Sequence, residues 1–344
     1  MARKILVTGG TGYIGSHTVV ELQNAGYEVI IVDNLSNSNA EVVEGITRIT
    51  GKRPAFEKVD CNNMDDMRNV FGKYQGFDGV IHFAASKAVG ESVQKHLLYY
   101  RNNVVSLLNI LELMSQYGVK GIVFSSSCTV YGQPDILPVD ENAPIKPALS
   151  PYGNTKQICE EIINDTIHAN APFRAILLRY FNPIGAHPSA EIGELPLGVP
   201  QNLIPYLTQT AMGIRAELSV FGNDYNTPDG SCIRDYINVV DLAKAHVIAM
   251  NRMIEEIAEE NVEIFNLGTG RGVSVLELIE SFTRATGVAV PHKIVGRREG
   301  DIAQVWAHPQ RANEVLGWTA QENLDDTLAS AWRWQQKLRE RGIM

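Results

Sequence analysis

KILVTGGTGYIG, residues 4–15, contains the strongest structural signal in the chain. Its first five residues form an apolar strand pattern, and a helical pattern follows the glycines as far as Ala25. Glycines at such a junction permit a tight turn and close approach of backbone to a pyrophosphate, and the helix N-terminus supplies amide donors. The order of strand, glycine turn and helix therefore predicts a dinucleotide site at Gly9, Gly12 and Gly15.

The next expected strand, Glu28 to Val32, ends at Asp33, eighteen positions past Gly15. An acidic residue at this spacing binds the ribose hydroxyls of an adenosine, and its charge repels a 2′-phosphate. The sequence therefore predicts NAD as the cofactor in preference to NADP.

Strand and helix patterns alternate through the first half of the chain, which predicts a parallel sheet. The longest helical pattern runs from about Glu91 to Tyr117. The further expected strands are Phe56 to Val59, Gly79 to Ala84, Gly121 to Phe124, Arg174 to Arg179 and, late in the chain, Glu263 to Gly268.

These patterns predict an α/β fold: a Rossmann-type doubly wound parallel sheet with a smaller mixed α/β C-terminal substrate domain. We expect the cofactor domain to span residues 1–181, rejoined by about 237–268. Residues 182–236 and 269–344 are then expected to form the substrate domain.

Several polar or aromatic residues follow expected strands at the carboxyl edge, where such sheets bind ligands. Asp60 and Cys61 end one strand, and residues 83–87 end another, although Phe83 and Ala84 are equally compatible with ordinary core. Asn102 and Asn103 interrupt the apolar pattern of the long helix. They lie either on an exposed face or in a buried position with partners from a cofactor site.

A second cluster of reactive groups is expected where Ser150 and Pro151 begin a helix. Tyr152 and Lys156 then share one helix face, and Ser127 closes the fifth strand at the same sheet edge. A lysine about 4 Å from the phenol supplies roughly the 4 kcal/mol that brings a tyrosine pKa from 10 to near 7. With a nicotinamide cofactor, this group predicts reversible oxidation of an alcohol.

The composition, with 44% hydrophobic and 20% charged residues, is ordinary for a soluble globular protein of 344 residues. No apolar run has the length of a membrane span, and the sequence predicts a cytoplasmic protein with no membrane partner. A net charge of −9 argues against nucleic acid. The four cysteines, Cys61, Cys128, Cys159 and Cys232, lack the spacing of a metal or disulfide framework, so no metal site is expected.

The chain resembles the extended short-chain dehydrogenases/reductases in TGGTGYIG (8–15), HFAA (82–85), SSSCTVYG (125–132) and YGNTK (152–156). Within that family it is most similar to the UDP-glucose 4-epimerases of the galactose pathway. The segments specific to that branch are KAVGESV (87–93), LRYFNPIGAHPS (178–189), NLIPY (202–206), VFGNDY (220–225), RDYI (234–237) and RREGD (297–301).

The resemblance implies a tightly held NAD and interconversion of UDP-glucose and UDP-galactose through a transient 4-keto sugar. It implies Ser127, Tyr152 and Lys156 as the catalytic group. The cofactor would contact the glycine turn and the residues Tyr13, Ile14, Asp33, Asn34, Leu35, Ser36, Asn37, Ser38, Asp60, Cys61, Phe83, Ala84, Ala85, Lys87, Asn102, Ser127, Tyr152, Lys156 and Phe181. The UDP-hexose would contact Asn182, Asn202, Leu203, Phe221, Arg234, Arg298, Asp301 and Val305. For Arg234, a surface salt bridge with Asp235 or Asp241 is the alternative.

Val305 departs from the narrow-specificity bacterial members of the family, which carry a tyrosine four residues past the aspartate of RREGD. In the family this position limits the room beside the sugar 2-substituent. The smaller valine predicts that N-acetylated UDP-hexosamines are also accepted. The resemblance further implies a homodimer formed through the helices beginning near Glu91 and Pro151.

Two alternative functions fit the same fold. A nucleotide-sugar 4,6-dehydratase would need an Asp-Glu pair where this chain has Cys128 and Thr129. A non-catalytic NAD-sensing protein would be expected to lose the serine, the tyrosine or the lysine, and all three are present.

Overall fold

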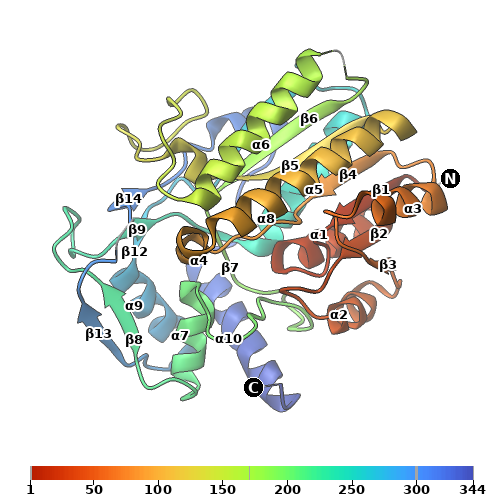
Figure 1. Ribbon diagram of the computed structural model, residues 1–344. Helices are drawn as coiled ribbons and strands as arrows, with labels where there is room; N and C mark the ends of the chain where they lie inside the picture. The colour runs from red at the N-terminus through yellow and green to blue at the C-terminus, as the bar shows by residue number, and fades with distance from the viewer. Residues whose placement is uncertain (1, 170, 299–300, 344) are drawn as a thin grey trace.

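A seven-stranded sheet, parallel throughout, is the central layer of residues 2–169, 171–298 and 301–343, the part of the chain that the computed structural model describes (Figure 1). The strand order is β11-β6-β5-β4-β1-β2-β3. The strands are β1 (Lys4–Thr8), β2 (Glu28–Asp33), β3 (Ala55–Lys58), β4 (Gly79–His82), β5 (Gly121–Ser127), β6 (Arg174–Tyr180) and β11 (Val262–Leu267). The order reverses between β1 and β4, which is the topological switch point where such sheets bind ligands. The predicted fold class is confirmed.

The observed strands differ from the expected ones mainly at their ends. Strand β5 continues three residues past Phe124, so that Ser127 is its last residue. Strand β11 pairs with β6 at the edge of the sheet, so a segment from late in the chain does join it. The division into two domains stays a prediction. Met1 and Met344 lie outside the described residues, as do Glu299 and Gly300 of the RREGD segment.

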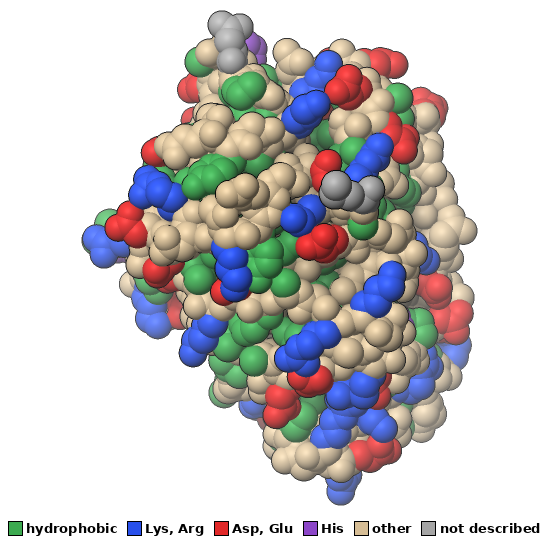
Figure 2. Space-filling view, turned by 90° about the vertical axis from the view of Figure 1, so that its right-hand side faces the viewer, with side chains coloured by type: hydrophobic (Ala, Val, Ile, Leu, Met, Phe, Trp, Pro, Cys, Tyr) green, Lys and Arg blue, Asp and Glu red, His purple; other side chains and the backbone are tan. Residues whose placement is uncertain are grey.

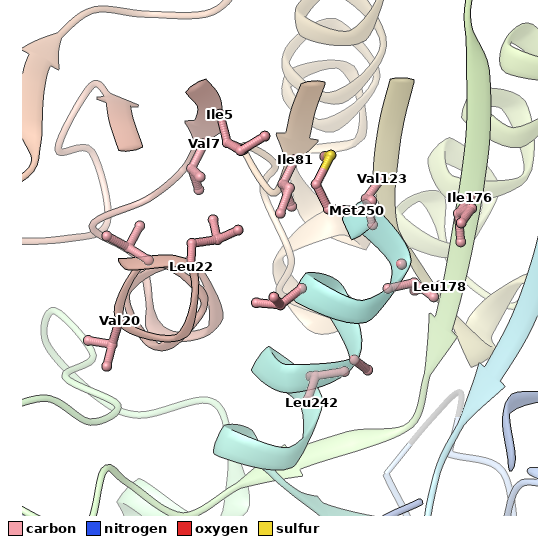
Figure 3. Close-up of a cluster of buried hydrophobic side chains, with 14 of the residues drawn as sticks. Ile5, Val7, Val20, Leu22, Ile81, Val123, Ile176, Leu178, Leu242 and Met250 are labelled. Carbon is pink, nitrogen blue, oxygen red and sulfur yellow. The ribbon is translucent and has the colours of Figure 1, made fainter. Parts of the chain in front are cut away.

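Helices cover both faces of the sheet because every strand carries apolar side chains on both sides. The first face is covered by α1 (Tyr13–Asn24), α2 (Glu41–Thr50) and α8 (Val239–Ile254). Figure 3 shows this core, in which Val7, Ile81 and Val123 of the sheet face Leu22 of α1 and Met250 of α8. The opposite face is covered by α3 (Met64–Tyr74), α5 (His96–Tyr117) and α6 (Pro151–His168).

The single helix expected from Glu91 to Tyr117 is wrong. The segment forms two helices, α4 (Val89–Gln94) and α5, separated at Lys95, whose backbone leaves the helical region at φ −121° and ψ 43°. The hydroxyl of Tyr99 accepts a hydrogen bond from the amide of Ala88 at 3.1 Å and donates to Glu91 Oε2 at 2.9 Å. These contacts fold α4 back against α5. The apolar periodicity of the sequence continues through Lys95, so it does not predict the break between the two helices.

The smaller region packs around its own apolar core, which includes Leu207, Leu278 and Phe282. Its elements are α7 (Leu203–Ala211), β8 (Leu218–Phe221), α9 (Val275–Thr286), β13 (His292–Val295) and α10 (Leu324–Glu340). Short strands connect it to the large sheet: β7 (Asn182–Ile184) pairs with β10 (Tyr236–Asn238), and β9 (Ile233–Arg234) lies between β12 (Val273–Ser274) and β14 (Gln304–Val305). Figure 1 shows this region on one side of the carboxyl edge of the sheet.

None of the helices in the described residues has the length and apolar character needed to cross a membrane. On the face shown in Figure 2, acidic side chains lie among the basic ones. The cytoplasmic location stays a prediction.

A buried ion pair joins α6 to β6 behind the expected catalytic residues. Arg179 is 4% exposed and Glu160 6% exposed, and the guanidinium donates twice to the carboxylate, at 3.0 Å and 2.6 Å. Arg179 also donates to the hydroxyl of Tyr131 at 3.0 Å, and the hydroxyl of Ser126 donates to Glu160 Oε1 at 2.5 Å. Every charged group in this network has a partner, which is the condition for a buried pair to be tolerated.

We expect Glu160→Gln to lower the free energy of unfolding by about 3–5 kcal/mol, because it leaves the Arg179 charge buried without its anion. Urea denaturation measures this loss. Glu161→Gln, at the exposed next position of the same helix, is the matched control and should change the stability by less than about 0.5 kcal/mol. Equal effects of the two substitutions would contradict a structural role for the pair.

Candidate active site

The turn between β1 and α1 requires glycine for steric reasons. Gly9 has a φ of +70°, and a Cβ added there would lie 2.8 Å from the amide nitrogen of Ala84. A Cβ on Gly15 would lie 2.3 Å from the carbonyl oxygen of Gly9. The N-cap residue of α1 is Gly12, which has no side chain to cap the helix, and none of the described residues of the first turn is acidic. The turn therefore fits the phosphates of a dinucleotide, which need close backbone approach and free amide donors.

Asp33 ends β2 directly beside this turn and is 9% exposed. Its Oδ1 accepts hydrogen bonds from the amide of Leu35 at 2.9 Å and the hydroxyl of Ser38 at 3.0 Å, and its Oδ2 accepts from the amide of Thr11 at 3.2 Å. The carboxylate thus holds the loop of residues 34–38 against the glycine turn. In that loop Leu35 has a φ of 61°, while Ser36 and Asn37 are exposed.

A chain of side-chain amides around one carboxylate links the segments after β2 and β3 to α5. Asn34 Nδ2 donates to Asp60 Oδ2 at 3.2 Å, and Asn62 donates both to Asp60, at 2.8 Å, and to Asn102 Oδ1, at 2.9 Å. Burial raises the pKa of Asp60, but the hydrogen bonds from Asn62 and Asn34 outweigh it and leave the pKa below its ordinary value. Cys61 is buried next to Asp60.

Of the two asparagines in α5, Asn103 is the buried one, at 3% exposed. Its Oδ1 accepts from the amide of Ser86 at 2.8 Å, and its Nδ2 donates to Thr155 Oγ1 at 3.0 Å. Asn103 therefore fixes the loop after β4 to α6 between Tyr152 and Lys156. Asn102 is half-buried and donates to Ser86 Oγ at 3.2 Å. From the sequence, these asparagines could lie either on an exposed face or in a buried position with partners. Asn103 is buried and has partners.

Ser127, Tyr152 and Lys156 converge at the carboxyl end of β5. Ser150 caps α6 by accepting from the amide of Gly153 at 3.1 Å, with Pro151 in the first turn, as the sequence predicted. Tyr152 is 8% exposed and hydrogen-bonded to Ser127, itself 6% exposed. Lys156 is 4% exposed, and its Nζ donates to the carbonyl oxygen of Ser125 at 2.5 Å.

The protein's own groups raise the pKa of Tyr152, whereas the sequence predicted that the lysine and the cofactor lower it. Burial raises the pKa of Tyr152 well above its ordinary value and Tyr180 adds to this, whereas the hydrogen bond with Ser127 lowers it. Lys156 Nζ lies 5.9 Å from the centroid of the Tyr152 ring and points to Ser125 instead. Burial also lowers the pKa of Lys156 to about 8, against the opposing effects of Cys159 and Glu160. Burial in a low dielectric disfavours both the Tyr152 phenolate and the Lys156 ammonium. The spacing of the two residues along the helix does not reveal that burial.

The loop after β4 forms one wall of the site. Phe83 is half-buried, with its ring 4.7 Å from that of His246 on α8. Ala84 touches the glycine turn, and Ala85 is half-buried next to it. At the mouth of the loop, Lys87 Nζ lies 5.7 Å from the centre of the Tyr13 ring.

The residues expected to contact the UDP-sugar form separate groups. Val305 pairs with Arg234 across β14 and β9, and its side chain, 5% exposed, lies in a cluster with Phe181. Elsewhere, the Arg298 guanidinium lies 5.2 Å from the centre of the Phe221 ring and 2.7 Å from Asp301 Oδ1.

The remaining three expected contacts lie at the borders of these groups. Asn182, in β7, donates its amide to the carbonyl oxygen of Asp235 at 3.0 Å. Asn202 and Leu203 stand at the start of α7, where Leu203 packs on the core of the smaller region.

Asp235, which the sequence did not single out as a site residue, organises the junction of the two regions. It is fully buried, and its carboxylate accepts from the amides of Thr269, at 2.9 Å, Gly270, at 3.1 Å, and Ala307, at 3.2 Å. Because these donors fill the carboxylate, the alternative pairing of Arg234 with Asp235 does not occur. Arg234 forms no ion pair with any described residue, Asp241 included. An aspartate between two short strands, β9 and β10, gave no signal of this role in the sequence.

Cys128 follows Ser127 at the position where a dehydratase needs an acid. Burial raises the pKa of its thiol to about 12, although Arg234 lowers it. The group is thus a neutral thiol at physiological pH. Among the described residues, no cluster of histidine, cysteine, aspartate or glutamate side chains could hold a metal ion.

The comparisons with known proteins agree with this site. The family model described as GDP-mannose 4,6 dehydratase matches residues 6–331. Human UDP-glucose 4-epimerase is 49% identical over 343 residues, which cover 98% of this chain and 97% of the human one.

Two solved structures are similar over nearly their whole length. The UDP-glucose 4-epimerase of Stenotrophomonas maltophila, with bound NAD and formylated UDP-arabinopyranose, has a TM-score of 0.95 at 46% identity, covering 98% of this chain and 99% of that one. The enzyme of Bifidobacterium longum, in complex with NAD+ and UDP, has a TM-score of 0.93 at 47% identity, covering 97% and 98%.

The parallel sheet, the glycine turn and the serine, tyrosine and lysine group define an NAD-dependent enzyme of the extended short-chain dehydrogenase/reductase class. Within that class, the chain belongs to the UDP-glucose 4-epimerase family, whose members are isomerases of class EC 5.1.3.2. It is therefore an enzyme, and the alternative of a non-catalytic sensing protein is set aside.

Proposed function

We propose that the protein interconverts UDP-glucose and UDP-galactose by inverting C4 through a transient 4-keto sugar, with NAD that stays bound. The observation that carries the proposal is the buried group of Ser127, Tyr152 and Lys156 at the carboxyl end of β5, beside the glycine turn. A reaction that begins and ends with an alcohol needs a proton acceptor that can return its proton, and Tyr152 meets that need.

The residues around the glycine turn fit NAD. The turn leaves room for a pyrophosphate, and Asp33, at the end of β2, suits a ribose with free hydroxyls. When bound, NAD supplies the acceptor and donor of the C4 hydride. Phe83 and Lys87 would then line the cofactor from the loop after β4, and Phe181 from the end of β6.

The chain's own residues handle the proton and the charge. Tyr152 would take the proton of the 4-hydroxyl and later return it to the same oxygen, and Ser127, already hydrogen-bonded to Tyr152, would hold that oxygen. Because burial opposes ionisation of Tyr152, nearby positive charge is needed for proton uptake. Lys156 supplies one buried cation. Arg234, free of ion pairs with described residues, and Arg298 are suited to the diphosphate.

We expect Tyr152→Phe to lower kcat for UDP-galactose by about 10²–10⁴-fold, because it removes the group that exchanges the proton. The NAD content of the purified variant should match that of the wild type, since the aromatic ring is retained. A coupled assay for UDP-glucose measures kcat. A folded variant that keeps more than a tenth of the wild-type kcat would exclude Tyr152 as the proton acceptor.

We further propose that the site accepts UDP-N-acetylglucosamine and UDP-N-acetylgalactosamine. The position of Val305 supports this proposal. Val305 pairs with Arg234, which is expected to contact the UDP-sugar, and lies in a cluster with Phe181, which is expected to contact the cofactor. A tyrosine at the same place would have to displace the cluster or project into the sugar site, and either change reduces the room for a 2-acetamido group.

Val305→Tyr should therefore lower kcat/KM for UDP-N-acetylgalactosamine by at least about tenfold, while kcat/KM for UDP-galactose changes by less than about threefold. The second substrate is the internal control for folding. Parallel losses on both substrates would point to a packing defect, and unchanged turnover of the acetylated substrate would show that this position does not set the specificity.

We propose that two copies associate through α4, α5 and the loop before α6. Large apolar side chains are exposed there: Val93 at 60%, Leu97 at 72%, Leu98 at 51% and Leu149 at 51%. Leu149 lines a cavity of about 370 Å³, together with Tyr100, Ser150 and Asn154. A concentrated apolar surface of this kind favours burial against a partner.

Sedimentation equilibrium should give about twice the chain mass of 37.9 kDa. Leu97→Glu should shift the equilibrium toward the monomer, because it brings a charge into the interface. Ile257→Glu, at an isolated side chain that is 56% exposed, is the control and should leave the mass unchanged. A monomeric wild type would contradict the proposal.

A further inference from the structure

Glu194 lies in the long connection between β7 and α7, where it contacts one residue from each side of the proposed site. Its Oε1 lies 3.4 Å from Lys87 Nζ, on the cofactor side. The same oxygen accepts a hydrogen bond from Asn202 Nδ2, on the substrate side, at 2.5 Å. The Glu194 side chain is only 13% exposed. One carboxylate oxygen therefore joins the loop after β4 to the start of α7.

The backbone that carries Glu194 is held firmly. Trp334 of α10 donates its indole N–H to the carbonyl oxygen of Glu194 at 2.9 Å. Gly193 fits flat against the same indole, since an added Cβ would lie 2.5 Å from Trp334 Cδ1. At the start of the connection, the Tyr13 hydroxyl donates to the carbonyl oxygen of Gly185 at 2.7 Å. The connection is thus fixed to α1 and to α10. These contacts set the position of the backbone from which the Glu194 carboxylate extends.

Asn202 is used in an unusual way. It occupies the N-cap position of α7, where an asparagine side chain ordinarily accepts a hydrogen bond from a backbone amide of the first turn. In α7 no such side-chain bond is formed. The side chain of Asn202 donates to Glu194 instead, so its orientation is set by the carboxylate and not by the helix that it begins.

Lys87 is held in a similar manner. Its Nζ lies between the Glu194 carboxylate and the face of the Tyr13 ring, 5.7 Å from the ring centre. Tyr13 stands in the first turn of α1, next to the glycine turn. The carboxylate and the ring together restrict a side chain that is otherwise 44% exposed.

We propose that Glu194 is a positioning residue of the epimerase site: its Oε1 fixes the separation between Lys87, which contacts the cofactor, and Asn202, which contacts the UDP-sugar. The inference rests on the proposed function, on the cofactor contact proposed above for Lys87, and on the UDP-sugar contact that the family resemblance implies for Asn202. Both contacts reach Glu194 from outside the catalytic group, so it affects how cofactor and sugar are held relative to one another and takes no part in proton transfer.

Two substitutions separate the contacts. Glu194→Gln keeps an oxygen that accepts from Asn202 but removes the charge that attracts Lys87. We expect it to increase the NAD lost on repeated gel filtration by roughly threefold to tenfold, with KM for UDP-galactose within twofold of the wild type. Glu194→Ala removes both contacts and should raise KM by roughly threefold to tenfold as well. In a double-mutant cycle, Lys87→Met should add little to the NAD loss of Glu194→Gln.

Glu191→Gln is the matched control. Glu191 lies in the same connection and is also partly buried, but its carboxylate pairs with Arg48 of α2 and Arg341 beyond α10, away from the site. It should change the melting temperature without changing NAD retention or KM. If Glu194→Gln and Glu194→Ala alter only the melting temperature, as Glu191→Gln is expected to, Glu194 is merely structural and the inference is overturned.

The NAD measurement does not depend on turnover, so the two proposals fail in different ways. A wild-type protein that retains NAD but does not turn over UDP-galactose would refute the proposed function, and calorimetric titration of UDP would then replace KM. If Glu194→Ala does not fold, Glu194→Gln alone decides the inference through NAD retention.

Discussion

The hydrogen bond from Lys156 to the carbonyl oxygen of Ser125 is the interaction on which the site depends. This bond sets the distance between α6 and β5. That distance places Tyr152 next to Ser127 at the end of the strand. Asn103 secures the same helix from the opposite side through Thr155, and the Arg179 to Glu160 pair secures it one turn further on. A cation buried in this way is costly, as the lowered pKa of Lys156, about 8, indicates. The fold retains that charge where the proposed chemistry needs it, a common compromise between stability and activity.

The substrate side is organised by a different principle, in which single carboxylates, one buried and one partly buried, join segments distant in sequence. Asp235 gathers three backbone amides from the loop after β11 and the segment after β14. Glu194 bridges the loop after β4 to α7. Because such carboxylates lie at the junction of the large sheet and the smaller region, they set how the two expected binding surfaces face each other. Neither is part of the catalytic group, and both determine its surroundings.

The sequence predicted the parallel sheet, the glycine turn and the start of α6 because each depends on local rules: strand periodicity, the steric need for glycine, and a serine cap followed by proline. It failed where the determining contacts are distant in sequence. The break at Lys95 depends on Tyr99 reaching back to Ala88 and Glu91, and the raised pKa of Tyr152 depends on burial that no spacing reveals. Asn103 could be singled out from its polar position in an apolar helix, but its partners could not. The roles of the cofactor and substrate residues stay predictions, founded on motif resemblance and on where these side chains lie.

The central claim, that a hydride and a proton leave and return within one closed site, is tested most directly by incubating the protein as purified, without added NAD, with UDP-galactose. The account predicts conversion to a stable mixture of UDP-galactose and UDP-glucose, with NAD recovered unreduced in an amount that does not change with turnover. Accumulation of NADH in proportion to product, or release of a dehydrated keto sugar in place of UDP-glucose, would contradict it.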